Sequence, residues 1–95
     1  MSVVIIGGHE RMETRYKEIC KKYNHKSKVF TKMKSDLSSQ IGCPDLVILF
    51  TSTVSHKMIR CAVTESERHH SRLERSHSSS ASALIQILET YAENA

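Results

Sequence analysis

The chain has 95 residues, of which 39% are hydrophobic and 25% charged, a balance typical of one folded domain over residues 1–95 and not of a disordered chain. No apolar run approaches the roughly 18 residues of a membrane span, and residues 1–8 lack the basic start of a secretory signal, so we expect a cytoplasmic protein without membrane contact. The net charge of +4 arises between positions 10 and 34, where nine basic residues accompany three acidic ones. This excess fits either a solvated helix face or an anionic partner.

The first strand is predicted at residues 3–6, where four consecutive β-branched side chains are typical of a strand buried on both faces of a parallel sheet. Gly7 and Gly8 then allow the backbone to turn sharply. A helix is predicted over residues 10–23, because its apolar residues recur with a period near 3.6. These residues are Met12, Tyr16, Ile19, Cys20 and Tyr23.

Further along the chain, strands and helices continue to alternate. Apolar and polar residues alternate imperfectly over residues 27–33, which predicts a second strand at a sheet edge, where its lysines reach water. Residues 34–42 are expected to form at most a short helix. The apolar run at 45–51 predicts the other central strand, and Ser55 is the expected N-cap of a helix over 55–69. The remaining expected elements are a polar strand at 71–76, a serine-rich loop at 77–80 and a helix at 79–93.

This order of elements predicts an α/β fold. Alternating strands and helices form a parallel sheet with right-handed crossovers. We expect a small three-layer Rossmann-like or flavodoxin-like domain with a four-stranded sheet in the order 2-1-3-4, which places the two all-apolar strands at the centre.

Three histidines follow strands of this predicted sheet. His9 follows the first strand, His56 the third and His77 the fourth, so all three would lie at the carboxyl edge, where open α/β sheets bind ligands. A histidine beside a glycine turn is also a common capping residue. As ligands, neutral imidazoles suit iron or another transition metal, bare or as haem, and Arg11 or Lys57 would pair with cofactor carboxylates. A haem would need a second subunit to cover it, so this interpretation includes a homodimer.

A phosphate or nucleotide at the helix N-termini is the alternative ligand. The residues available to hold it are Gly7, Gly8, Thr51, Ser52, Thr53 and Ser55, with Arg11 nearby. The patterns G-x-G-x-x-G and G-x-x-x-x-G-K-[ST] are both absent. Nucleic-acid binding through Arg15, Lys22 and Lys26 is the weakest alternative.

Catalysis has little support in the sequence. His9-Glu10 lacks the second histidine of H-E-x-x-H, and G-x-S-x-G does not occur, so we expect a non-catalytic protein. Cys20, Cys43 and Cys61 are widely spaced and odd in number, which favours buried structural thiols over disulfides or a zinc site.

These residues together carry a family resemblance. Three segments carry it: the run V-V-I-I-G-G-H-E-R with Tyr16, the run D-L-V leading to Thr51 and V-S-H, and the serine-rich turn before Leu84. In these segments the chain resembles the bacterial family called domain of unknown function 2325. The resemblance implies a small Rossmann-like domain without an established enzymatic activity, in a family with some relatives associated with haem and dioxygen binding. Its implied site residues are Gly7, Gly8, His9, Glu10, Ser55 and His56. The chain departs from the family at Ser52-Thr53, where an Asp-Cys pair is expected.

Overall fold

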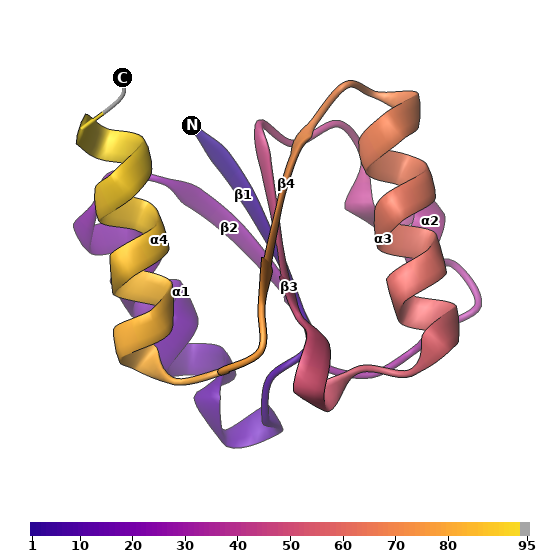
Figure 1. Ribbon diagram of the computed structural model, residues 1–95, viewed down its shortest axis with the longest axis horizontal. Coiled ribbons are helices and arrows are strands. Elements are labelled where there is room, and N and C mark those ends of the chain that lie inside the picture. Colours follow the sequence, from indigo (N-terminus) through magenta and orange to yellow (C-terminus); the bar gives the residue numbers. More distant parts are fainter. Residues whose placement is uncertain (94–95) are drawn as a thin grey trace.

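The computed structural model describes residues 1–93 and shows four parallel strands in the order β2-β1-β3-β4, with helices on both faces of the sheet (Figure 1). The predicted fold class and strand order are confirmed. The elements in chain order are β1 (Ser2–Ile6), the 3-10 turn η1 (Glu10–Met12), α1 (Glu13–Lys22), β2 (Lys26–Phe30), α2 (Leu37–Ile41), β3 (Leu46–Phe50), the 3-10 turn η2 (Thr51–Thr53), α3 (His56–Arg68), β4 (Arg72–Ser76) and α4 (Ala81–Glu93).

The two central strands form the middle of the core. All five residues of β3 are buried, as are the last four of β1, because strands inside a parallel sheet are covered on both faces. Successive side chains point to opposite faces. Val3 and Ile5 pack with α1 and α4, whereas Val4 and Ile6 pack with α2 and α3.

The two fully buried aromatic side chains lie on the α1/α4 face. Tyr16 and Phe50 are both fully buried, and their ring centroids are 5.4 Å apart. Leu84 and Leu88 of α4 complete this side of the core. The α1 and α4 ribbons lie together on one side of the sheet in Figure 1, with α2 and α3 on the other.

The polar strand predicted at the edge of the sheet does form, as β4. Its residues pair with β3 from Leu46 opposite Arg72 to Phe50 opposite Ser76. The hydroxyl of Tyr91 accepts a hydrogen bond from Nε of Arg72 at 3.1 Å and donates one to the carboxylate of Glu74 at 2.7 Å. An edge strand can therefore be polar because its side chains bond to α4 instead of filling the core.

Two boundaries differ most from the predictions. The first helix was expected from residue 10, but Glu10–Met12 form a 3-10 turn and the α-helix begins at Glu13. The second strand was expected to reach residue 33, but it ends at Phe30, and Met33 is 38% exposed. The physical reason is that β1 ends at Ile6, which pairs with Phe30, so the next residues have no neighbouring strand to bond.

The expectation that all three cysteines are buried was wrong for one of them. Cys20 is fully buried and Cys61 is half-buried, but Cys43 is exposed. Cys43 follows Gly42 in the loop that ends α2, where the chain runs along the surface before entering β3.

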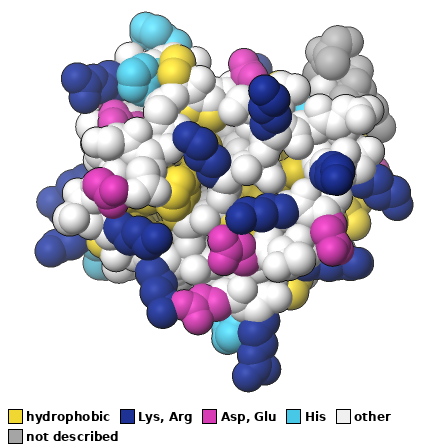
Figure 2. Space-filling view, turned by 180° about the vertical axis from the view of Figure 1, so that it is seen from behind, with side chains coloured by type: hydrophobic (Ala, Val, Ile, Leu, Met, Phe, Trp, Pro, Cys, Tyr) yellow, Lys and Arg dark blue, Asp and Glu magenta, His cyan; other side chains and the backbone are white. Residues whose placement is uncertain are grey.

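The basic residues are spread over the surface. Seen from behind, Lys and Arg side chains are distributed over the face, with hydrophobic side chains visible between them (Figure 2). Among the described residues, no helix has the length and apolar character needed to cross a membrane.

Candidate functional site

The carboxyl ends of β1 and β3 bring two chain turns together. Ile6 pairs with Leu49, so the segment from Gly7 onward lies beside the turn that follows Phe50. β4 ends next to β3, because Phe50 pairs with Ser76, and His77 follows directly. His9, His56 and His77 therefore all follow strands that end at one edge of the sheet.

Gly7 is enclosed by the turn after β3. Its φ angle is +103°, and a Cβ atom added here would lie 2.6 Å from Cγ1 of Val54 and 3.0 Å from the carbonyl oxygen of Phe50. Its N–H donates to the carbonyl of Phe30 at 2.8 Å. A side chain at this position would have no space, and the N–H is already bonded within the fold.

Gly8 is enclosed by α1 in the same way. Its φ angle is +85°, and an added Cβ atom would lie 2.6 Å from Cε2 of Tyr16. Its N–H donates to Oγ1 of Thr53 at 2.7 Å, and that hydroxyl donates to the carbonyl of Phe50 at 3.1 Å. The pair of glycines thus allows two turns and a buried tyrosine to pack against one another.

The hydroxyl of Tyr16 extends this packing to the loop before α4. It donates a hydrogen bond to the carbonyl oxygen of Ser79 at 2.5 Å. Burial raises the pKa of Tyr16 above its ordinary value, and the hydrogen bond to Ser79 opposes that shift. Sequence reasoning placed Tyr16 in the core but missed this hydrogen bond. The one signal for it in the sequence is a tyrosine on the buried stripe of the helix that follows a Gly-Gly pair.

His9 acts as a cap. It is exposed, its backbone is extended, and its Nδ1 accepts a hydrogen bond from the backbone N–H of Arg11 at 3.2 Å. A neutral imidazole that accepts at Nδ1 carries its proton on Nε2, so Nε2 has no lone pair for a metal while this cap is formed.

The charged residues after His9 are exposed. Glu10 forms an ion pair with Lys32. The hydrogen bond and charge of Lys32 lower the pKa of Glu10, and Glu10 raises the pKa of Lys32 for the same reasons. Sequence reasoning missed Lys32, because it lies beyond β2 and approaches Glu10 only in the folded chain.

The turn after β3 is more open. Ser55 caps α3 by accepting a hydrogen bond from the N–H of Met58 at 3.3 Å, as predicted. His56 and Lys57 follow as exposed residues in the first turn of α3. Their side chains have no hydrogen bond or ion pair to any residue that the structure describes, and their backbone N–H groups point out of the helix end unbonded, as first-turn N–H groups do.

His77 lies on the far side of this turn. The hydroxyl of Ser52 donates to the His77 carbonyl at 2.5 Å, and Oγ1 of Thr51 lies 3.4 Å from the carbonyl of Ser76. Within residues 1–93, no three His, Cys, Asp or Glu side chains are grouped to hold a metal ion. His9, His56 and His77 therefore share one edge without forming a three-residue cluster.

The comparisons with known proteins agree with this architecture. Residues 2–91 match a family described as an uncharacterized protein conserved in bacteria, DUF2325. The chain belongs to the DUF2325 family. No curated protein matches this DUF2325 chain. Among solved structures, it is similar to a de novo designed Rossmann fold protein, ROS2_36830, with a TM-score of 0.64 and 13% identity over 96% of each chain, which shows the fold alone.

Proposed function

We propose that this DUF2325 protein is a non-catalytic ligand-binding or sensor protein that holds iron, as haem, at the carboxyl edge of β1 and β3. The supporting observation is His56, whose exposed side chain stands at the start of α3 without a hydrogen bond to the described residues. Histidine is a common axial ligand of haem iron, and this edge is where the fold family binds ligands.

Haem suits this edge better than a bare metal ion. The porphyrin supplies four of the iron ligands, so the protein needs to provide only one or two. A bare iron site commonly needs three protein side chains, and the described residues contain no such group. When bound, haem supplies an iron that can take up dioxygen.

The two histidines of the proposed site are not equivalent. His9 must give up its hydrogen bond to the N–H of Arg11 before Nε2 can bind iron. Such a cap contributes about 1 kcal/mol, close to a tenfold change in affinity. His56 gives up no hydrogen bond to a described residue, so we assign it the main ligand role and His9 the weaker one. Arg11 and Lys57 would pair with the carboxylates of the cofactor.

A single chain offers little apolar cover at this edge. Among the described residues, the exposed large hydrophobic side chains are Met1 and Met33, and neither belongs to the two turns. A haem bound there would expose an apolar face, so the proposal includes a homodimer that closes over the cofactor.

A haem titration tests this proposal. Purified protein titrated with hemin should give a shifted and intensified Soret band, and the double variant His9→Ala/His56→Ala should not. The matched control is His25→Ala/His70→Ala, which removes two histidines away from this edge and should keep the band. An unchanged hemin spectrum with wild-type protein, or an unchanged band in the His9/His56 variant, would contradict the proposal. Light scattering with and without hemin should show the dimer.

A phosphate or nucleotide is the second candidate. The observation that favours it is the first turn of α3, where the backbone N–H groups of His56 and Lys57 are unbonded and the Lys57 side chain adds a positive charge. The N–H groups of Gly7 and Gly8 do not contribute, because Phe30 and Thr53 already accept them. Thermal unfolding with a nucleotide panel tests this candidate, because a ligand at 100 times its Kd adds about 2.7 kcal/mol of stability. No stabilisation by any member would dismiss it.

A further inference from the structure

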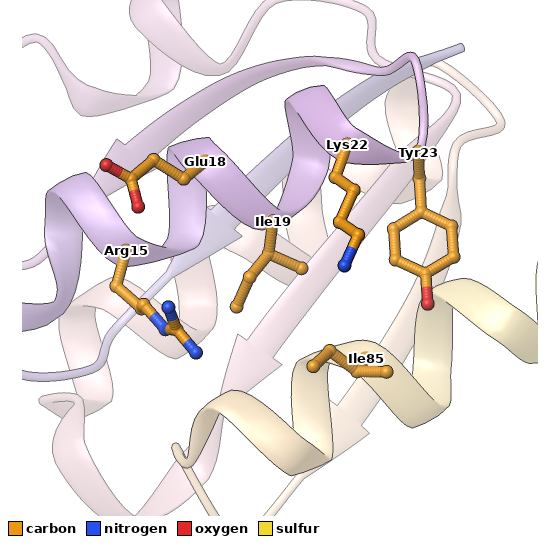
Figure 3. A pocket seen from close by; sticks show the side chains of 6 residues that line it. All are labelled: Arg15, Glu18, Ile19, Lys22, Tyr23 and Ile85. Atoms are coloured by element: carbon orange, nitrogen blue, oxygen red, sulfur yellow. The ribbon is translucent and has the colours of Figure 1, made fainter.

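A groove runs between α1 and α4 on one face of the sheet. Its cavity volume is about 210 Å³. The side chains that line it are Arg15, Glu18, Ile19, Lys22, Tyr23 and Ile85, and Figure 3 shows all of them. None of these residues belongs to the proposed haem site.

The floor of the groove is apolar. Ile19 of α1 is 6% exposed, and Ile85 of α4 is half-buried and packs against the same core cluster. The hydroxyl of Tyr23 donates to the carboxylate of Glu89 at 3.0 Å, which ties the end of α1 to α4. A hydrocarbon chain or small ring placed here would contact isoleucine side chains from both helices.

The rim of the groove carries two cations. Arg15 and Lys22 are seven residues apart, which is close to two helical turns, so they lie on the same side of α1. In Figure 3 both side chains extend from α1 toward Ile85, while the Glu18 carboxylate points away from it. Neither cation forms an ion pair with any residue in the described part of the chain.

We propose that this groove binds a small amphipathic anion, with a carboxylate, sulfonate or phosphate between Arg15 and Lys22 and an apolar body on Ile19 and Ile85. The cavity volume of 210 Å³ corresponds to about seven water molecules at roughly 30 Å³ each, which suits a short acyl chain or a single ring. A second copy of the chain is a poor occupant. A two-fold contact centred on this groove would bring Arg15 and Lys22 against the same cations of the partner, in a chain of net charge +4.

Octanoate and 1-octanol provide a matched pair of probes, since they have the same chain length and only octanoate is charged. The measurement is the chemical shift of the isoleucine δ1 methyl groups in ¹³C-labelled protein. Octanoate should give saturable shifts at Ile19 and Ile85, and 1-octanol should bind much more weakly. Scattered or non-saturable shifts, or equal binding of the two probes, would overturn the proposal.

Two double variants test the role of the cations. Arg15→Gln/Lys22→Gln should weaken octanoate binding about tenfold, as expected for the loss of two charge-assisted contacts at a solvent-exposed rim. Lys17→Gln/Lys21→Gln removes the same charge from α1 at positions outside the groove and should stay within about twofold of wild type. Equal weakening in both variants would show a general charge effect and would overturn the proposed site. A circular dichroism spectrum identical to wild type confirms that each variant is folded.

Discussion

The turns that follow β1 and β3 lie side by side at the carboxyl edge of the sheet, but the fold uses them differently. After β1, the N–H groups of Gly7 and Gly8 and the Nδ1 of His9 are all bonded within the chain. After β3, Ser55 caps the helix, and the exposed side chains of His56 and Lys57 make no hydrogen bond to a described residue. Both turns bond to other parts of the fold, the second through the hydroxyls of Thr51, Ser52 and Thr53. Only the second turn leads into two side chains that present unbonded groups to solvent.

This difference shows why proximity alone does not define a ligand site. Both turns contain a histidine after a central strand, and both histidines are exposed. They differ in whether a ring nitrogen is already bonded, and that depends on the local backbone of each turn. We therefore propose a structural role for the turn after β1 and a binding role for the turn after β3.

The largest expected effect comes from filling the space at Gly8. Gly8→Ala places a Cβ atom 2.6 Å from Cε2 of Tyr16 at a φ of +85°, and the sum of strain and overpacking should lower the free energy of unfolding by about 3 kcal/mol. Gly42→Ala is the matched control. Its φ is +65° and its ψ is −138°, which favours glycine, but nothing lies within 4 Å, so backbone strain alone should cost about 1–2 kcal/mol. Urea denaturation measures the free energy of unfolding of both variants. Equal losses of stability in Gly8→Ala and Gly42→Ala would contradict the packing role of Gly8.

The next effect concerns the hydrogen bond between Tyr16 and the loop before α4. Tyr16→Phe keeps the buried ring but removes the donor to the Ser79 carbonyl, which is 2.5 Å away in the wild type. The free energy of unfolding should fall by about 1 kcal/mol, because the half-buried Ser79 carbonyl can regain a bond to water. Denaturant unfolding of the two proteins provides the measurement, and an unchanged midpoint would show that this bond is not needed.

The two histidines give a direct comparison of stability. His9→Ala removes the acceptor for the Arg11 N–H and should lower the free energy of unfolding by about 1 kcal/mol. His56→Ala removes an exposed side chain without a hydrogen bond to the described residues and should change it by less than about 0.5 kcal/mol. Both are measured by urea denaturation without ligand. A larger loss for His56→Ala would reverse the assigned roles.

The smallest effect is a change in titration. In the folded protein, NMR should find the pKa of Glu10 below its ordinary value, and Lys32→Gln should raise it again, because the hydrogen bond and charge of Lys32 cause the shift. Since the folded pKa is lowered, the pair's contribution to stability is present at neutral pH and is lost as the pH falls through that pKa. At alkaline pH the other partner decides the outcome. Because the folded pKa of Lys32 is raised, the ion pair's contribution to stability is lost as the pH rises through the pKa of Lys32. A Glu10 pKa that does not respond to Lys32→Gln would contradict the ion pair.

Much of the fold follows from local patterns in the sequence. The apolar runs that form β1 and β3 are recognisable because strands covered on both faces need apolar side chains at every position. The strand β4 has no such pattern, and only the alternation of elements predicts it. The exposed Cys43 and the early end of β2 were missed because both depend on which neighbouring segment is present.

The candidate site is less predictable from the sequence than the fold. The topology places His9 and His56 at one edge, but the cap at His9 depends on backbone angles of a short 3-10 turn. The hydrogen bonds of Gly8 and Tyr16 join residues that are far apart in the sequence. Gly8 and its partner Thr53 are separated by 45 positions, and Tyr16 and its partner Ser79 by 63. Periodicity reports only neighbours along the chain, so it does not reveal that such distant groups are already bonded.

The most direct test of the different roles of the two turns is the haem dissociation constant of His56→Ala compared with that of His9→Ala. We expect His56→Ala to weaken haem binding about a hundredfold, equivalent to roughly 2.7 kcal/mol, and His9→Ala to weaken it about tenfold or less. A greater loss for His9→Ala, or equal losses in the two variants, would contradict the assignment of binding to the turn after β3.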